Sequence, residues 1–241
     1  MSDQATINRI RSAEVVVEPF AHAVIEDFLE PDLFQALRRT FPDPETMQDI
    51  RARRAAVGYA EGRLFLSADD LAATLDAPTG MRPFARLLDL ARSKAFTREL
   101  VGLFADTVRE QLKRRDDDVK LRTPNVDVIC DRSGFALPPH TDGNAKLVTA
   151  LVFMADPGDP PEHGTRLYRP NRPDARCETG AAAYPFEAFT EVAVAPYRPN
   201  VAILFARSPV SFHGVAASGS DIPRRILQIP LVGEFRSRQS A

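Results

Sequence analysis

The sequence has no tryptophan, only four histidines and only two cysteines among its 241 residues. Cys130 and Cys177 are too few for a fold built on disulfides, and we expect two free or buried thiols in a reducing compartment. No apolar run is long enough to cross a bilayer, and the polar N-terminal segment lacks the apolar stretch of a secretory signal. These absences predict a soluble, cytoplasmic protein without a membrane partner.

Neither sign of charge dominates the composition. The formal net charge is -2 at pH 7 and the sequence pI is about 6.1, so no general basic surface indicates a nucleic-acid partner. Apolar residues make up 44% of the chain, while glycine and proline contribute only 12 and 20 residues. This composition allows a large hydrophobic core, and the length predicts one domain over residues 1–241.

The first 120 residues read as short strands followed by helices, which would form an N-terminal layer. The strands are expected as a pair or as one strand broken by Pro19, because apolar and β-branched residues surround this proline. Helices are expected where apolar side chains recur at helical spacing. The expected strands cover residues 15–17 and 23–25, and the expected helices cover 31–41, a stretch from Phe84 to Ala91, and 96–112.

After residue 120 the chain becomes a series of short β-type runs without helices between them. Their spacing favours an antiparallel sandwich or jelly roll over a parallel sheet, and we expect this core to span residues 121–235. The runs cover residues 126–130, 147–154, 191–195, 201–206 and 226–232.

A long, proline-rich segment from Asp156 to Glu187 lies between these runs. Segments of this length inside a domain are usually functional lids or disordered stretches. We expect part of it to flank the functional site and to order over the substrate. The alternative is a solvated insertion with one buried strand at Gly164–Tyr168.

His140, Asp142 and His213 form the main candidate site. Side chains at i and i+2 of an extended segment point to the same side, so His140 and Asp142 can offer an imidazole and a carboxylate to one ion. His213 follows a distant apolar run, and its imidazole would complete a facial triad with three open positions, as in non-haem Fe(II) oxygenases. The alternatives are an ordinary loop histidine at position 140 and a capping or core histidine at position 213.

The two remaining histidines are weaker candidates. His163 lies beside Glu162 in a loop, where a histidine is usually exposed, and both residues are rival ligands. His22 follows Phe20 near an expected strand, where a structural role is expected.

The order of these motifs resembles the 2-oxoglutarate- and Fe(II)-dependent dioxygenases, and among them the prolyl 4-hydroxylase-like branch. The resemblance covers most of the chain and is densest from 125 to 232. The similar segments are GFALPPHTD at 134–142 with AKLVTALVF at 145–153, GTRLY at 164–168, FHGV at 212–215 with RRILQ at 224–228, and PFAHAVIEDFL at 19–29. The resemblance implies a double-stranded β-helix, a cupin-like jelly roll with a helical layer. It also implies that His140, Asp142 and His213 bind Fe(II), with 2-oxoglutarate and O2 as cosubstrates.

By the same resemblance, an arginine anchors the remote carboxylate of 2-oxoglutarate, since a guanidinium matches a planar carboxylate better than an ammonium does. Two adjacent arginines are candidates. The register in which Leu227 and Gln228 follow at +3 and +4 favours Arg224. Strict alternation through residues 225, 227, 229 and 231 would place Arg225 on the more apolar face. We prefer Arg224 and keep Arg225 as the alternative.

Some features depart from the resemblance. Asp131 stands nearest to the position where many relatives have a tyrosine that hydrogen-bonds the cosubstrate. A carboxylate there would repel a dicarboxylate, so we expect Asp131 to point away from the site or to contact a basic substrate group. The chain also lacks the tryptophan that some relatives place near the cosubstrate. Lys146 and Arg166 are possible ligand contacts, with solvated surface charges as the ordinary alternative.

The resemblance implies hydroxylation of an unidentified substrate, peptidyl or free amino acid or small metabolite, with release of succinate and CO2. A non-oxidative cupin-type metal- or ligand-binding protein is the alternative, but it has no reason to keep an arginine eleven or twelve residues beyond the distal histidine. A binding domain with incidental histidines is a third hypothesis and predicts no metal. The N-terminal helices could form a substrate platform or the face of a homodimer.

Overall fold

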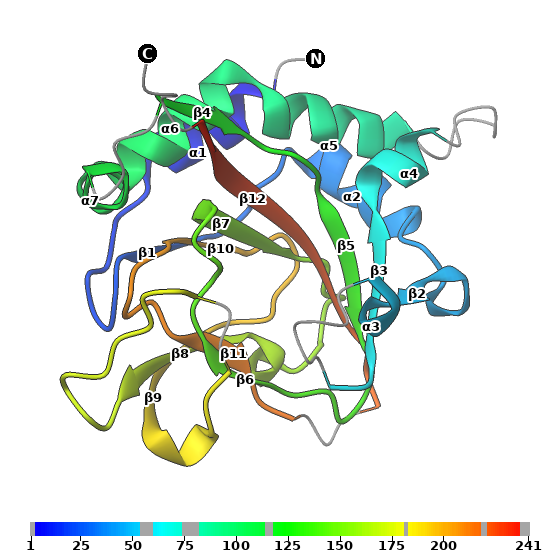
Figure 1. Cartoon of the computed structure of the whole chain (residues 1–241). Helices are drawn as coiled ribbons and strands as arrows, with labels where there is room; N and C mark the ends of the chain where they lie inside the picture. The colour runs from blue at the N-terminus through cyan, green and yellow to red at the C-terminus, as the bar shows by residue number, and fades with distance from the viewer. Residues whose placement is uncertain are drawn as a thin grey trace.

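The computed structural model describes residues 3–53, 60–73, 82–113, 118–180, 183–217 and 221–236. Most helices lie on one side of a large antiparallel sheet, and a small antiparallel sheet lies on its other side (Figure 1). The mainly β architecture with flanking helices, predicted from the sequence, is confirmed. In the described ranges, no helix combines the length and the apolar character that crossing a membrane requires.

Local signals explain where the helices begin and end. Pro31 occupies the first turn of α2, and Ser93 caps α6 by accepting a hydrogen bond from the Phe96 N–H at 3.1 Å. The single helix predicted over 96–112 is wrong, because the chain leaves helical geometry at Phe104 and forms two helices. The helices are α1 (Gln4–Ser12), α2 (Pro31–Arg39), α3 (Ile50–Arg53), α4 (Ala68–Ala73), α5 (Arg82–Arg92), α6 (Lys94–Leu103) and α7 (Ala105–Lys113).

The large sheet runs in the order β1-β10-β7-β12-β5-β3-β2, with β4 also paired to β12. Its strands are β1 (His22–Ile25), β2 (Gln48–Asp49), β3 (Arg63–Ser67), β4 (Asp118–Arg122), β5 (Asp127–Asp131), β7 (Lys146–Phe153), β10 (Ala202–Ala206) and β12 (Arg224–Arg236). The small sheet runs in the order β6-β11-β8-β9, with β6 (Leu137–His140), β8 (Thr165–Pro170), β9 (Phe189–Ala195) and β11 (His213–Val215). The N-terminal part of the chain therefore supplies strands as well as helices.

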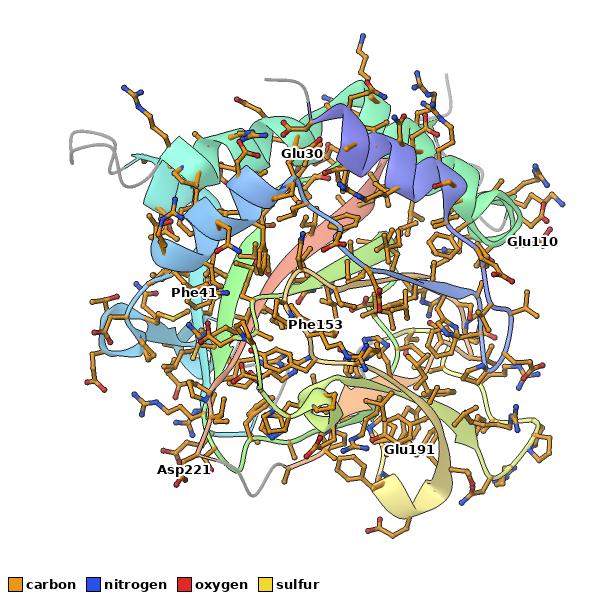
Figure 2. All side chains as sticks on the ribbon, turned by 180° about the vertical axis from the view of Figure 1, so that it is seen from behind. Glu30, Phe41, Glu110, Phe153, Glu191 and Asp221 are labelled. Carbon is orange, nitrogen blue, oxygen red and sulfur yellow. The ribbon has the colours of Figure 1, made fainter. Side chains whose placement is uncertain are left out.

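Both faces of the large sheet are covered, which explains why its strands read as continuous apolar runs. One face of β10 places Leu204 in the core beneath the helices, and the other places Ile203 and Phe205 in the core between the sheets. Figure 2 shows Phe153 of β7 deep in the molecule, and it belongs to this second core. The pocket described below opens from the same face.

Five of the predicted β-type runs correspond to β5, β7, β9, β10 and β12. The expected strand at 15–17 is reduced to one bridge between Val16 and His22. Cys130 and Cys177 are both buried and form no disulfide with each other, as the sequence predicts.

Candidate metal centre and its pocket

Strand pairing in the small sheet brings the three predicted metal ligands together. His140 at the end of β6 is the register partner of His213 at the start of β11, and their ring centroids are 4.4 Å apart. Asp142 follows His140 by two residues, and one ligand atom from each of the three side chains lies within 4.8 Å of the others. His140 and His213 are 73 positions apart in the chain, yet with Asp142 they offer two nitrogens and one oxygen to a single ion.

Backbone carbonyls orient both imidazoles. The Nδ1 of His140 lies 2.9 Å from the Pro138 carbonyl, and the Nδ1 of His213 lies 3.0 Å from the Ser211 carbonyl. Each Nδ1–H therefore donates to a carbonyl, which leaves each Nε2 with a free lone pair for a metal. Burial lowers the pKa of both histidines, and His213 lowers that of His140 further, to about 3. Neutral imidazoles of this kind are ready metal ligands.

Asp142 is buried and held as a carboxylate by two neighbours from β7. Its Oδ1 accepts from the Lys146 ammonium at 2.7 Å, and its Oδ2 accepts from the Thr149 hydroxyl at 2.6 Å. Burial alone would raise the pKa of Asp142, but the charge of Lys146 and these two hydrogen bonds lower it well below its ordinary value. Lys146 is thus part of the site rather than a solvated surface charge.

A pocket of about 40 Å³ opens between the two sheets beside these groups. The small sheet contributes both histidines, Thr165 and apolar side chains, and the large sheet contributes charged, polar and apolar ones. The lining residues are Arg63, Leu137, His140, Asp142, Lys146, Thr149, Leu151, Thr165, His213, Gly214, Val215, Arg224, Ile226 and Gln228.

The two candidate arginines lie on opposite faces of β12. Arg224 lines the pocket and is buried, donating from Nε to the His163 carbonyl at 2.7 Å and from Nη2 to Thr165 Oγ1 at 2.9 Å. Burial lowers the pKa of Arg224, although the charge of Asp131 opposes this shift. Arg225 turns towards the helical layer, pairs with Asp156 and lies over the Phe41 ring. Only Arg224 is therefore positioned for a ligand in the pocket.

Asp131 contacts neither solvent nor an open face of the site. Its Oδ2 accepts from Arg224 Nη1 at 2.9 Å, and both of its oxygens accept from Arg63 at 2.6 and 2.8 Å. The basic partners of Asp131 are thus two arginines of the protein itself, whereas the expected basic partner was a substrate group. Arg63, which the sequence analysis did not single out, also lines the pocket.

The other candidates lie outside the cluster of ligand atoms. His163 is buried, contrary to the exposed loop position expected, and its ring lies 6.2 Å from that of Tyr197. His22 has its ring Nδ1 2.8 Å from the Phe20 carbonyl, as suits a structural role. Arg166 forms an ion pair with Glu191 on the small sheet. Glu162 lies in the short helical turn before β8 and is exposed.

Part of the proline-rich segment runs against the metal-binding motif. The N–H of Tyr184 donates to the Pro139 carbonyl, and Ala183 forms a β-bridge with His140. Gly180 has φ +71°, and a Cβ there would lie 2.2 Å from the Asp142 carbonyl oxygen. Residues 181 and 182 lie outside the described ranges. The segment also contains β8, which corresponds to the buried strand expected at Gly164–Tyr168.

Arg207 links this segment to the stretch that carries His140 and Asp142 through hydrogen bonds. Its buried guanidinium donates to the carbonyls of Cys177 and Glu178 at 2.8 and 2.9 Å, and to that of Asp142 at 3.3 Å. The sequence analysis did not single out this residue, which follows β10 directly.

The donor set fits a divalent transition metal. Two neutral imidazoles and one ionised carboxylate on one side of an ion leave coordination positions open for further ligands, which suits Fe(II). Thr149 and the two carbonyls that orient the histidines would hold these ligands in place when the metal binds.

Comparison by sequence finds no matching protein-family model and no matching curated protein. Solved structures match the fold. The epimerase SnoN, in complex with Fe3+, alpha ketoglutarate and nogalamycin RO, is 16% identical, with 99% of this chain and 89% of that chain covered and a TM-score of 0.53.

Two prolyl 4-hydroxylases match in the same way. One from Phytophthora capsici is 18% identical over 99% of this chain and 70% of its own, with a TM-score of 0.54. One from Pseudomonas putida is 13% identical over 96% of this chain and 98% of its own, with a TM-score of 0.50. The chain therefore has the jelly-roll fold of these proteins, which confirms the predicted double-stranded β-helix.

Proposed function

We propose that the protein is an Fe(II)- and 2-oxoglutarate-dependent oxygenase that hydroxylates a peptide, a free amino acid or a small metabolite. One observation carries this proposal: a single pocket contains both the three clustered metal ligands and the buried Arg224. The fold likeness to the epimerase SnoN, which was determined with Fe3+ and alpha ketoglutarate, supports the same metal and cosubstrate.

The charges around the pocket favour a dianionic ligand. Arg63, Lys146 and Arg224 contribute three positive charges, whereas Asp131 and Asp142 contribute two negative ones, so one positive charge remains even before a metal binds. A bound Fe(II) adds two more. Buried charge of one sign is unfavourable without a partner, and a dicarboxylate supplies that partner.

Each side chain has a defined task in this proposal. His140, Asp142 and His213 hold the iron, and Arg224 holds the remote carboxylate of 2-oxoglutarate. With O2, the iron centre supplies the oxidising chemistry that yields succinate, CO2 and a hydroxylated product. Lys146 and Thr149 each donate to one oxygen of Asp142, and a second lone pair remains on each oxygen for the metal.

The test measures metal-dependent binding and turnover separately. Under nitrogen, 2-oxoglutarate should bind the Fe(II)-loaded protein and produce a metal-to-ligand charge-transfer band, and it should bind the metal-free protein far more weakly. In air, untargeted peptide and metabolite mixtures should then be screened for succinate release that depends on iron.

The leading alternative is a non-oxidative metal- or ligand-binding protein of the same fold. It predicts metal binding without a charge-transfer band and without succinate from any mixture. That outcome would replace the oxygenase proposal, and absence of metal binding would favour the third hypothesis of incidental histidines.

A further inference from the structure

Arg63, Asp131 and Arg224 form one row across three adjacent strands. Arg63 of β3 and Arg224 of β12 are both register partners of Asp131 of β5. Directly paired side chains lie on the same face of a sheet, and opposite charges in such pairs attract. The row faces the pocket, since both arginines line it.

The row is almost fully buried and carries a net positive charge. The exposed fractions are 5% for Arg63, 3% for Asp131 and 4% for Arg224. One carboxylate thus neutralises only one of two guanidinium groups. Arg63 takes the larger share, with both Asp131 oxygens bound at 2.6 and 2.8 Å, while Arg224 reaches one oxygen at 2.9 Å. The Arg63 guanidinium also lies 4.5 Å from the centre of the Phe135 ring.

Arg224 keeps donors for a ligand in spite of its contact with Asp131. A guanidinium has five N–H groups. Partners among the described residues use three of them: Nε donates to His163, one Nη1–H to Asp131 and one Nη2–H to Thr165. One N–H on Nη1 and one on Nη2 therefore remain as donors for a carboxylate ligand.

We propose that Arg63 is a positioning residue for the dicarboxylate. Arg63 neutralises Asp131, the residue that holds Arg224 in place. The positive charge of Arg224 is therefore not cancelled by Asp131, and two of its N–H groups stay available for the remote carboxylate of the ligand. The proposal rests on the proposed function, because the ligand is 2-oxoglutarate. Its consequence is a preference for dicarboxylates that depends on a strand from the N-terminal part of the chain.

Removing Arg63 should therefore change the affinity for 2-oxoglutarate through the net charge of the row. In Arg63→Gln, Asp131 is balanced only by Arg224, so a ligand carboxylate would enter a site without net positive charge. We expect the affinity for 2-oxoglutarate to fall by about tenfold or more, the effect of one buried opposite charge. In the double variant Arg63→Gln/Asp131→Asn, Arg224 is again an uncompensated cation, and affinity should return to within about threefold of wild type.

A second ligand separates this role from a general effect on the pocket. 2-Oxobutyrate has the same keto-acid group as 2-oxoglutarate but lacks the remote carboxylate. Its affinity should be unchanged by Arg63→Gln, so the ratio of the two affinities reports the anchor alone. Arg63→Lys, which keeps the charge, should retain a ratio close to that of wild type.

The stability of the free protein provides an independent readout. Asp131→Asn leaves two buried guanidinium groups side by side, so the Tm of the ligand-free protein should fall. The rise in Tm on adding 2-oxoglutarate should then be larger than for wild type, because the ligand supplies the missing negative charge.

The decisive experiment is calorimetric titration of both keto acids, under nitrogen, into the whole chain loaded with Fe(II). An unchanged affinity ratio in folded Arg63→Gln, or a double variant no better than the single one, would overturn the role of Arg63. If the double variant does not fold, Arg63→Lys against Arg63→Gln decides by the same ratio. If wild-type protein binds neither keto acid, the proposed function fails first, and the role of Arg63 fails with it.

Discussion

Replacing Arg224 by alanine should weaken 2-oxoglutarate binding, whereas the same change at Arg225 should not. The two residues are adjacent on β12 and chemically identical, but their side chains leave opposite faces of the sheet. Arg225→Ala is therefore a matched control for the loss of one guanidinium from this strand.

The expected magnitude follows from the burial of Arg224. Loss of one partner from a buried, hydrogen-bonded charge pair costs about 2–5 kcal/mol. Since about 1.4 kcal/mol corresponds to a factor of ten, affinity should fall by about 30-fold to several thousandfold. The Arg225 side chain is 23% exposed and paired with Asp156 outside the pocket, so its loss should change affinity by less than about threefold.

The change at Arg224 also affects the folded protein. The His163 carbonyl and the Thr165 hydroxyl lose a donor, and each buried group left without a partner costs about 1–3 kcal/mol. Circular dichroism and Tm must therefore show that Arg224→Ala is folded at the assay temperature. Anaerobic titration of 2-oxoglutarate, followed by the charge-transfer band, then gives the affinity. Near-wild-type affinity in both variants would refute the assignment of the anchor to β12.

Further predictions concern the metal ligands and the segment beside them. Replacing His140, Asp142 or His213 by alanine should in each case abolish iron binding or lower it severely. Metal analysis after gel filtration measures this, and full iron content in any of the three variants would contradict the triad. Gly180→Ala should lower both Tm and iron affinity, because the added Cβ would lie 2.2 Å from the Asp142 carbonyl oxygen. The control variant Gly134→Ala has a similar positive φ but nothing within 4 Å of the added Cβ, so it should lower only Tm. Equal iron affinity in the two glycine variants would show that the contact does not matter. Trimming residues 171–183 should let 2-oxoglutarate bind but reduce the yield of hydroxylated product per succinate, measured by mass spectrometry, and an unchanged ratio would make the segment an ordinary surface insertion.

The cluster of His140, Asp142 and His213 can be predicted from the sequence because its arrangement is partly local. His140 and Asp142 share one side of an extended segment whatever the rest of the fold does, and only three other histidines compete for the remaining position. The preference for Arg224 came from the register of Leu227 and Gln228, and the alternation that kept Arg225 as a rival has a structural explanation. Leu227, Ile229 and Leu231 pack beneath the helices, so the arginine in their phase faces away from the pocket.

Arg63 could not be predicted, because its role depends on strand register. Its partner Asp131 is 68 residues away in the chain, and no local pattern specifies which residues of two distant strands meet. Strand β6 was missed for another reason. It contains Pro138 and Pro139, which normally argue against a strand, but β6 is an edge strand of the small sheet, where proline is tolerated.

The position of β12 in the large sheet determines when folding of this sheet can be completed. This strand follows all other described strands in the chain, yet it lies between β7 and β5 in the large sheet. Before it is added, β7 and β5 each present an open edge, which invites pairing with other chains. Arg224 and Asp131 are 93 residues apart, and such distant pairings form slowly.

The strand that closes the sheet also carries the arginine of the pocket. A growing chain therefore cannot place Arg224, the proposed dicarboxylate anchor, in the pocket before β12 has inserted between β7 and β5. Fragments that end before Arg224 should aggregate rather than form a weakened version of the site. During refolding, 2-oxoglutarate should have no effect on the early collapsed species and should stabilise only molecules in which β12 has already inserted.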